Sequence, residues 1–147
     1  MNRRGFTLLE IVVVLAIIGV ASVMVYPKVG TVLTRQDVRG ARSLVSTMHA
    51  KARASAVSRG RRTALAIVSG KLVIVSNHPV SGARDTVGTV VNVASRYGVA
   101  FTVSPARDSL IFDSRGLGTE TSATTIYVSK GGYTDSIAVS SLGRIQR

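Results

Sequence analysis

One carboxylate interrupts a long apolar run near the N-terminus. Glu10 is the single charged residue between Gly5 and Tyr26. A charged side chain at the centre of a bilayer helix costs about 2.5–3.5 kcal/mol, and somewhat less near the helix end. A plain apolar anchor gains nothing from such a residue. We therefore expect Glu10 to have a partner, and the best candidate is a neighbouring copy of the chain.

Residues suited to catalysis or metal binding are few. The chain contains two histidines, His49 and His78, and no cysteine. His49 has no Asp, Glu or Cys nearby in the sequence to complete a metal site, so we expect it to be a solvated polar residue. No nucleophile elbow, zinc-protease, Walker or dinucleotide-binding motif is present. The sequence therefore predicts no enzymatic activity, no metal site and no cofactor.

Composition limits both the architecture and the partners. The chain has 147 residues, enough for one domain and a membrane segment, and its net charge is +12. Without cysteine, the domain must be held together by packing alone. The excess of positive charge favours anionic partners, such as nucleic acid, anionic lipid headgroups or an acidic subunit.

The first part of the chain predicts one long helix, from Phe6 to about Ala56. Gly19 and Pro27 lie within it, and proline removes a backbone hydrogen bond, so we expect a kink near Tyr26. Beyond the proline, apolar residues recur at helical spacing, which predicts a face packed on a sheet. The residues of that face are Val38, Ala41, Leu44 or Val45, Met48 and Ala52.

A second stripe on the same stretch of helix is mostly basic, and Asp37 is the one acidic residue of this stretch. Its members are Arg35, Arg39, Arg42, Ser46, His49 and Arg53. Further arginines follow near Gly60, where we expect the helix to end. Cations are favourable at a helix C-terminus, so this last group also has a structural explanation.

After Gly60 the pattern changes to short β-branched and apolar runs separated by turns. The predicted strands span 63–68, 71–76, 86–93, 99–103, 109–113, 124–129 and 134–140, with a short edge strand within 143–147. Ser69-Gly70 predicts a hairpin between the first two. Strands at this spacing favour antiparallel sheets, two of them packed together. The predicted fold class is therefore α+β, with a long N-terminal helix followed by an antiparallel β domain.

The N-terminal stretch RRGFTLLEIVVVLAIIGV resembles the signature of type IV pilins and of the pseudopilins of type II secretion. The resemblance implies that a prepilin peptidase cuts after Gly5 and that the new N-terminal Phe6 is N-methylated. It further implies that Glu10 forms an ion pair with the N-terminal amine of an adjacent subunit in a filament, where the low dielectric favours pairing. Local melting of the helix between Gly19 and Pro27 in the filament is also implied.

An uncleaved signal anchor carrying a stray acid is the alternative interpretation of this N-terminal segment. An ordinary secretory signal fits less well, because its small-residue cleavage site follows the apolar core. In this chain the small residue at a boundary, Gly5, precedes the apolar run.

The C-terminal half resembles the GspH/FimT group of minor pilins and pseudopilins. The resemblance is carried by Phe112-Asp113-Ser114-Arg115-Gly116, by the runs 125–128 and 137–140, and by Gly143-Arg144-Ile145. Some FimT-like members bind DNA through a C-terminal Gly-Arg-x-Arg motif. In this chain Gln146 replaces the second arginine and Arg147 comes one residue late. The candidate DNA contacts are Arg35, Arg39, Arg42, Arg53, Arg144 and Arg147.

These resemblances imply a minor pilin or pseudopilin, assembled into a type II secretion pseudopilus or the tip or initiation complex of a type IV pilus. The alternative is a DNA-binding minor pilin in DNA uptake. The expected divisions are a leader at 1–5, a transmembrane and filament-core helix at 6–26, an amphipathic helix half at 27–60 and a β-rich domain at 61–147. Expected partners are other pilins or pseudopilins, the prepilin peptidase and the inner-membrane assembly machinery. We expect a single pass through the inner membrane, with the domain on the periplasmic side before incorporation into a filament.

Overall fold

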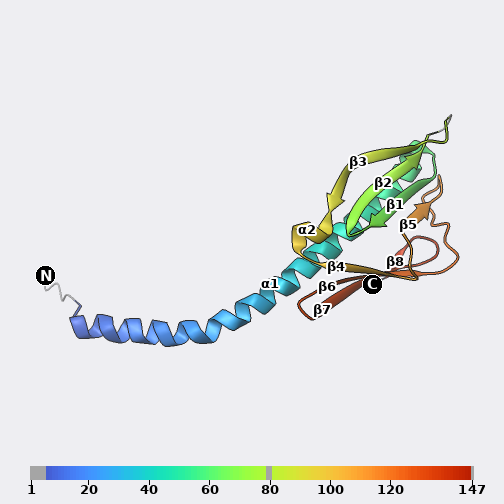
Figure 1. Cartoon of the computed structure of the whole chain (residues 1–147). Coiled ribbons are helices and arrows are strands. Elements are labelled where there is room, and N and C mark those ends of the chain that lie inside the picture. The colour runs from blue at the N-terminus through green and yellow to red at the C-terminus, as the bar shows by residue number, and fades with distance from the viewer. Residues whose placement is uncertain (1–5, 79–80, 147) are drawn as a thin grey trace. The chain divides into compact units, whose positions relative to one another are not determined.

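The computed structural model describes residues 6–78 and 81–146, apart from the side chains of residues 24–29 (Figure 1). The chain divides into two compact units, Met1–Thr34 and Arg35–Arg147, and each is described by itself. The predicted cleavage glycine, Gly5, and the last arginine, Arg147, lie outside the described residues.

The long helix, α1 (Leu8–Arg59), begins at a threonine cap. The backbone N–H of Glu10 donates a hydrogen bond to Thr7 Oγ1 over 3.2 Å, which satisfies one of the free donors of the first turn. The helix continues without interruption through both Gly19 and Pro27. The expected kink and the local melting in a filament stay predictions. Within the described part of the chain, no helical segment is both long and apolar enough to cross a membrane.

The C-terminus of α1 is closed by a glycine in the left-handed region. Gly60 has φ +60°, and its N–H donates to the carbonyl of Val57. The next N–H, of Arg61, donates to the carbonyl of Ala56. This pair of bonds is a Schellman motif, which turns the chain away from the helix into the first strand.

Two four-stranded antiparallel sheets follow the helix. Sheet A has the order β3 (Arg84–Asn92), β2 (Lys71–Asn77), β1 (Thr63–Val68) and β5 (Ser109–Phe112). Sheet B has the order β4 (Ala100–Ser104), β6 (Thr124–Lys130), β7 (Tyr133–Val139) and β8 (Ile145–Gln146). The predicted α+β class with two antiparallel sheets is confirmed, and the seven longer strands lie within two residues of their predicted bounds.

A short helix, α2 (Val93–Tyr97), joins the two sheets and was not predicted. The Asn92 side chain accepts a hydrogen bond from the N–H of Ser95 over 3.0 Å, and Gly98 ends the helix at φ +62°. Asparagine as an N-cap and glycine as a C-cap are the local signals that mark such a turn of helix. The sequence analysis placed Asn92 inside a strand that ends at residue 93, so these capping signals were overlooked.

The core lies between α1 and the inner faces of both sheets. The buried face of α1 consists of Val38, Ala41, Val45, Met48, Ala52 and Ala56, all at most 5% exposed. Sheet A contributes alternate residues such as Leu65 and Phe112, and sheet B contributes residues such as Ile126 and Val139. Of the two alternatives for the buried face, Leu44 and Val45, the structure buries Val45, whereas Leu44 is only half-buried.

Ala52 provides a test of this packing. We expect Ala52→Leu to destabilise the chain by about 1–3 kcal/mol, because a larger side chain has no space on a fully buried face. Ala50→Leu, on the exposed side of the same helix, is the matched control and should change stability by less than about 0.5 kcal/mol. Urea unfolding of the full chain in detergent measures both, and equal effects would contradict the assignment of the buried face.

Candidate functional site

The N-terminal part of α1 presents apolar side chains to its surroundings. Phe6 is 79% exposed, and exposed apolar residues continue to Val23. Glu10 is exposed among them and has no ion pair among the described residues. An uncovered apolar rod with one carboxylate near its start requires either lipid or other helices around it.

The geometry of the first turn adds a local reason for an acid at this position. Thr7 and Glu10 have the Thr-x-x-Glu spacing of a capping box, and the threonine half of that box is formed. A carboxylate in the first turn is also favoured by the helix dipole. Glu10 is therefore stabilised within its own helix, which the sequence analysis did not consider.

The predicted basic stripe of α1 meets the C-terminal edge of sheet B. Arg39 and Arg42 line an open hollow of about 530 Å³ together with Ser43, Ser46 and Ile145 of β8. Because β8 is the edge strand, the hollow lies where the helix stripe and the C-terminal segment come together. Sequence spacing alone did not place these two groups side by side.

Two arginines of the stripe contact residues of β7. Arg42 forms an ion pair with Asp135, with 3.5 Å between Nη1 and Oδ2. The Arg35 guanidinium lies 5.7 Å from the centre of the Tyr133 ring, within cation–π range. These contacts fix the stripe against sheet B. Arg144 is exposed, as Arg39 is, and its N–H donates to Ser140 Oγ over 3.1 Å.

The expectation that His49 is solvated was wrong. The side chain is 5% exposed, and its ring meets Phe112 edge-on with 5.1 Å between centroids. Its Nε2 is buried and has no hydrogen-bond partner among the described residues. Burial lowers the pKa of His49, and the positive charge of Arg53 lowers it further. His49 is therefore a buried member of the otherwise basic stripe.

The stem of Arg53, a candidate DNA contact, packs on the turn at Gly116. A Cβ placed on Gly116 would lie 2.8 Å from Val57 Cγ2 and 3.1 Å from Arg53 Cγ. Gly116 has φ +75°, so both space and backbone require glycine there. Asp113 closes the same turn by accepting the N–H groups of Arg115 and Leu117, and these bonds lower the pKa of its carboxyl.

The glycine of the C-terminal Gly-Arg pair is likewise required by packing. Gly143 has φ +77°, and a Cβ there would lie 2.9 Å from Phe112 Cε1 and 3.0 Å from the nitrogen of Gly118. The Phe112-to-Gly116 segment and the Gly143-Arg144 segment therefore share a single contact region around the Phe112 ring. Packing around this ring therefore explains why both segments carry glycine.

Lys130 joins three elements in a way that sequence reasoning missed. Its Nζ donates to Asp37 Oδ2 of α1 over 2.6 Å and to the carbonyl of Tyr97 at the end of α2 over 2.8 Å. Asp37, the acidic neighbour of the basic stripe, is therefore neutralised within the domain. Asp37 and Lys130 are 93 residues apart, so no local pattern signals the pair.

Comparison with known proteins follows the two halves of the chain. Residues 1–26 match the prokaryotic N-terminal methylation motif, and residues 40–143 match the family described as type II transport protein GspH. The chain belongs to the GspH family. It is thus a protein of the type IV minor pilin and pseudopilin class, in the GspH/FimT group.

Solved structures show the same fold. The type IV minor pilin FimU of Pseudomonas aeruginosa matches with a TM-score of 0.63 and 20% identity, over 76% of this chain and 88% of FimU. A second crystal form of FimU matches with a TM-score of 0.59 and 20% identity, over 74% of this chain and 90% of FimU. No curated protein matches the chain significantly.

The buried histidine predicts a pH dependence of stability in this GspH-family protein. The pKa of His49 is lowered in the folded state, so the unfolded chain takes up the proton first as the pH falls. We expect stability to decrease as the pH drops below about 6.5, the ordinary pKa of histidine. His49→Leu should flatten this decrease.

Urea unfolding of the full chain between about pH 7 and pH 5 measures the effect. Ala50→Leu on the exposed side of α1 is the control, because it removes no titratable group. A His49→Leu chain with the pH dependence of the wild type would show that another group is responsible.

Proposed function

We propose that the chain is a prepilin that is cleaved after Gly5, N-methylated at Phe6 and assembled as a minor pilin or pseudopilin. The filament is a type II secretion pseudopilus or the tip or initiation complex of a type IV pilus. The observation that carries the proposal is the exposed apolar surface from Phe6 to Val23 with one carboxylate, Glu10, in its first turn. The match of residues 1–26 to the methylation motif supports it.

Glu10 has a defined role in this proposal. Cleavage creates a cationic amine on Phe6, one helical turn from the carboxylate. In a bundle of staggered helices, the amine of one subunit neutralises Glu10 of the next, and the attraction is strong because the surroundings exclude water. The capping bond between Thr7 and Glu10 keeps the first turn helical while that contact forms.

The other partners follow from the same sequence of events. Before assembly, the apolar helix holds the chain in the inner membrane as a single pass, with the domain on the periplasmic side. The prepilin peptidase processes it there, and the assembly machinery then transfers the helix from lipid to other pilins or pseudopilins. The role is architectural, with no catalytic step assigned to the domain.

Glu10→Ala tests the role of the carboxylate. We expect processing to continue, so that intact-mass spectrometry finds a chain beginning at methylated Phe6. Filament incorporation should fall by about tenfold or more, because an uncompensated amine would remain in low dielectric. Thr7→Ser, which preserves the capping hydroxyl, is the control and should assemble normally. Normal incorporation of Glu10→Ala in sheared filament fractions would remove the proposed pairing.

A second candidate function is DNA binding during uptake. The hollow between α1 and β8 favours it, because Arg39 lies there beside the C-terminal segment that carries exposed Arg144. Arg42 contributes less, since Asp135 already pairs with it. Arg53 is held on the Gly116 turn and does not line the hollow.

Salt-dependent binding of single-stranded DNA to the full chain in neutral detergent tests this function. We expect log K to fall linearly with log salt concentration, with a slope of about −0.7 for each phosphate neutralised. Arg39→Ser with Arg144→Ser should reduce the slope by about one to two units, whereas Lys71→Ser with Arg96→Ser, exposed cations elsewhere, should not. A slope near zero for the wild type would exclude phosphate contact.

A further inference from the structure

The outer face of sheet A carries a shallow hollow with an apolar floor. Along β1, buried residues alternate with Ala64 and Ala66, which therefore point away from α1. Ala64 is paired with Val75 of β2 on one side and with Ile111 of β5 on the other. The hollow, of about 250 Å³, exists because the central strand has alanines where its neighbours have larger side chains.

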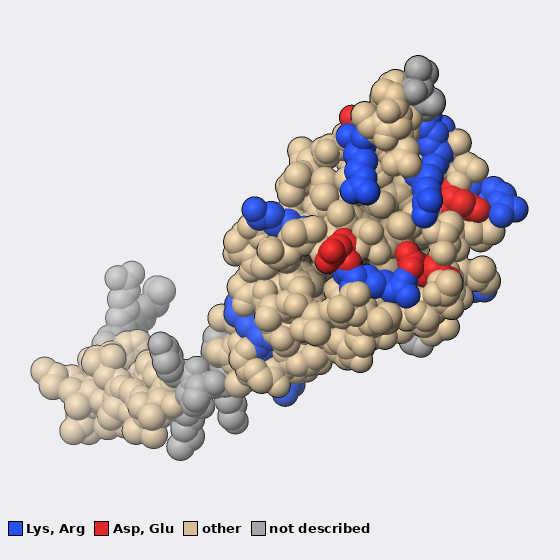
Figure 2. All heavy atoms as spheres, turned by 45° about the vertical axis from the view of Figure 1, so that its right-hand side comes forward, with Lys and Arg blue, Asp and Glu red and all other residues tan. Residues whose placement is uncertain are grey.

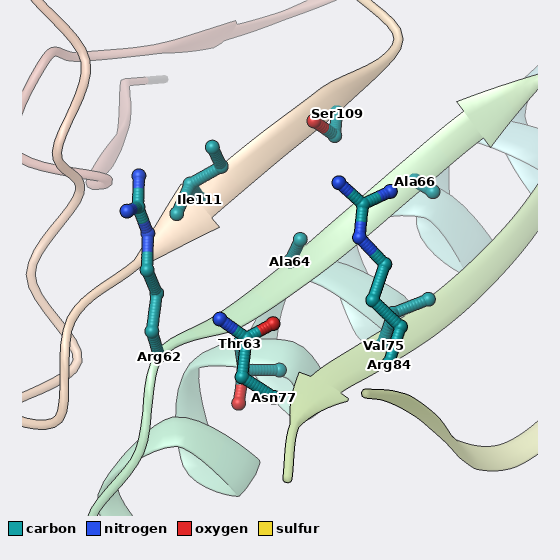
Figure 3. A pocket seen from close by; sticks show the side chains of 9 residues that line it. All are labelled: Arg62, Thr63, Ala64, Ala66, Val75, Asn77, Arg84, Ser109 and Ile111. Atoms are coloured by element: carbon teal, nitrogen blue, oxygen red, sulfur yellow. The ribbon is translucent and has the colours of Figure 1, made fainter. Parts of the chain in front are cut away.

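Polar and cationic residues flank this hollow. Arg84 of β3 is paired with Asn77 of β2, and the N–H of Asn77 donates to the carbonyl of Arg62 over 3.2 Å. Figure 3 shows the two arginine side chains on the same side of the sheet, with Ala64 and Ile111 between their guanidinium groups. Both arginines are exposed, and neither has an ion pair within the described residues.

The form of the hollow determines the class of ligand. Its volume is below the range of about 300–1,000 Å³ that small-molecule sites occupy, so it suits one or two side chains of a larger partner. No aromatic residue lines it, so nucleobases have no surface on which to stack. Each guanidinium fork matches a carboxylate, and the alanine floor between the two arginines matches an aliphatic side chain.

The charges of the chain indicate that the partner is a different protein. The described part of the second unit, residues 35–146, contains six acidic residues, and five of them form ion pairs within it. Within that range a second copy therefore offers only Asp108 as an acid without an ion pair, and its Glu10 lies in the apolar helix. Figure 2 shows the distribution of charged side chains on one face of the molecule, where some basic side chains adjoin acidic ones and others have no acidic neighbour in view.

We propose that this hollow docks an extended acidic and aliphatic segment of another protein. One carboxylate of that segment binds Arg62 and another binds Arg84, and the aliphatic side chain between them covers Ala64. The residues concerned belong to sheet A and to Arg62, which directly precedes β1, so the proposal does not depend on cleavage at Gly5 or on filament assembly.

The test uses the full chain in neutral detergent and a fluorescein-labelled peptide that repeats glutamate–serine–valine–serine. In an extended conformation, glutamate and valine of this peptide share one face. Fluorescence anisotropy should detect binding to the wild type. Arg62→Glu with Arg84→Glu should weaken it by about tenfold or more, because two charge-assisted contacts are lost.

Matched variants separate this site from general attraction. Lys71→Glu with Arg96→Glu changes the net charge equally but lies outside the hollow, so it should weaken binding by no more than about twofold. Arg62→Lys with Arg84→Lys keeps the charge and loses the planar forks, so it should weaken binding by several-fold. Circular dichroism and thermal unfolding confirm that each variant is folded.

Three results would overturn the proposal. The first is a wild-type chain that does not bind the peptide. The second is an equal loss of affinity in the two glutamate double variants, which would indicate diffuse charge. The third is oligothymidylate binding that depends on Arg62 and Arg84 while peptide binding does not, which would make this face a nucleic-acid surface.

Discussion

The domain depends on one face of α1, which serves as the core for both sheets. Sheets A and B share no strand pairing, and the inner faces of both pack on this helix. Ala41, Ala52 and Ala56 have no exposed surface, which allows the backbone of the helix to lie close to the strands. Because the chain has no cysteine, no disulfide supplements this packing.

The distribution of charge follows from the same packing. Asp37 and Asp135 lie where α1 meets sheet B, and they are neutralised by Lys130 and Arg42 across that contact. These acidic residues therefore form ion pairs between elements. The described lysines and arginines that have no acidic partner lie on the surface. The N-terminal unit needs a different environment, because its apolar side chains have no partner within the described chain.

The sequence predicted the long helix, the strands and the antiparallel arrangement because these depend on local signals. Alternation of apolar and polar residues specifies a strand, and Gly60 and Ser69-Gly70 mark the turns around β1. The helical spacing of apolar residues likewise predicted the buried face of α1. The short helix α2 was missed, because an adjoining strand pattern concealed its Asn92 and Gly98 caps. The candidate residues at the N-terminus were predictable from type and spacing, and their roles in cleavage and assembly stay predictions.

By itself, the sequence determined the order of the long helix and the strands, the family and the lone carboxylate of the apolar helix, since each resides in a short contiguous pattern. The tertiary structure alone decided what the charged and polar residues do. It placed His49 under Phe112, held Arg53 on a turn, and set Arg62 and Arg84 on either side of an alanine floor. Those outcomes depend on which segments distant in sequence come into contact, and no local periodicity encodes that pairing.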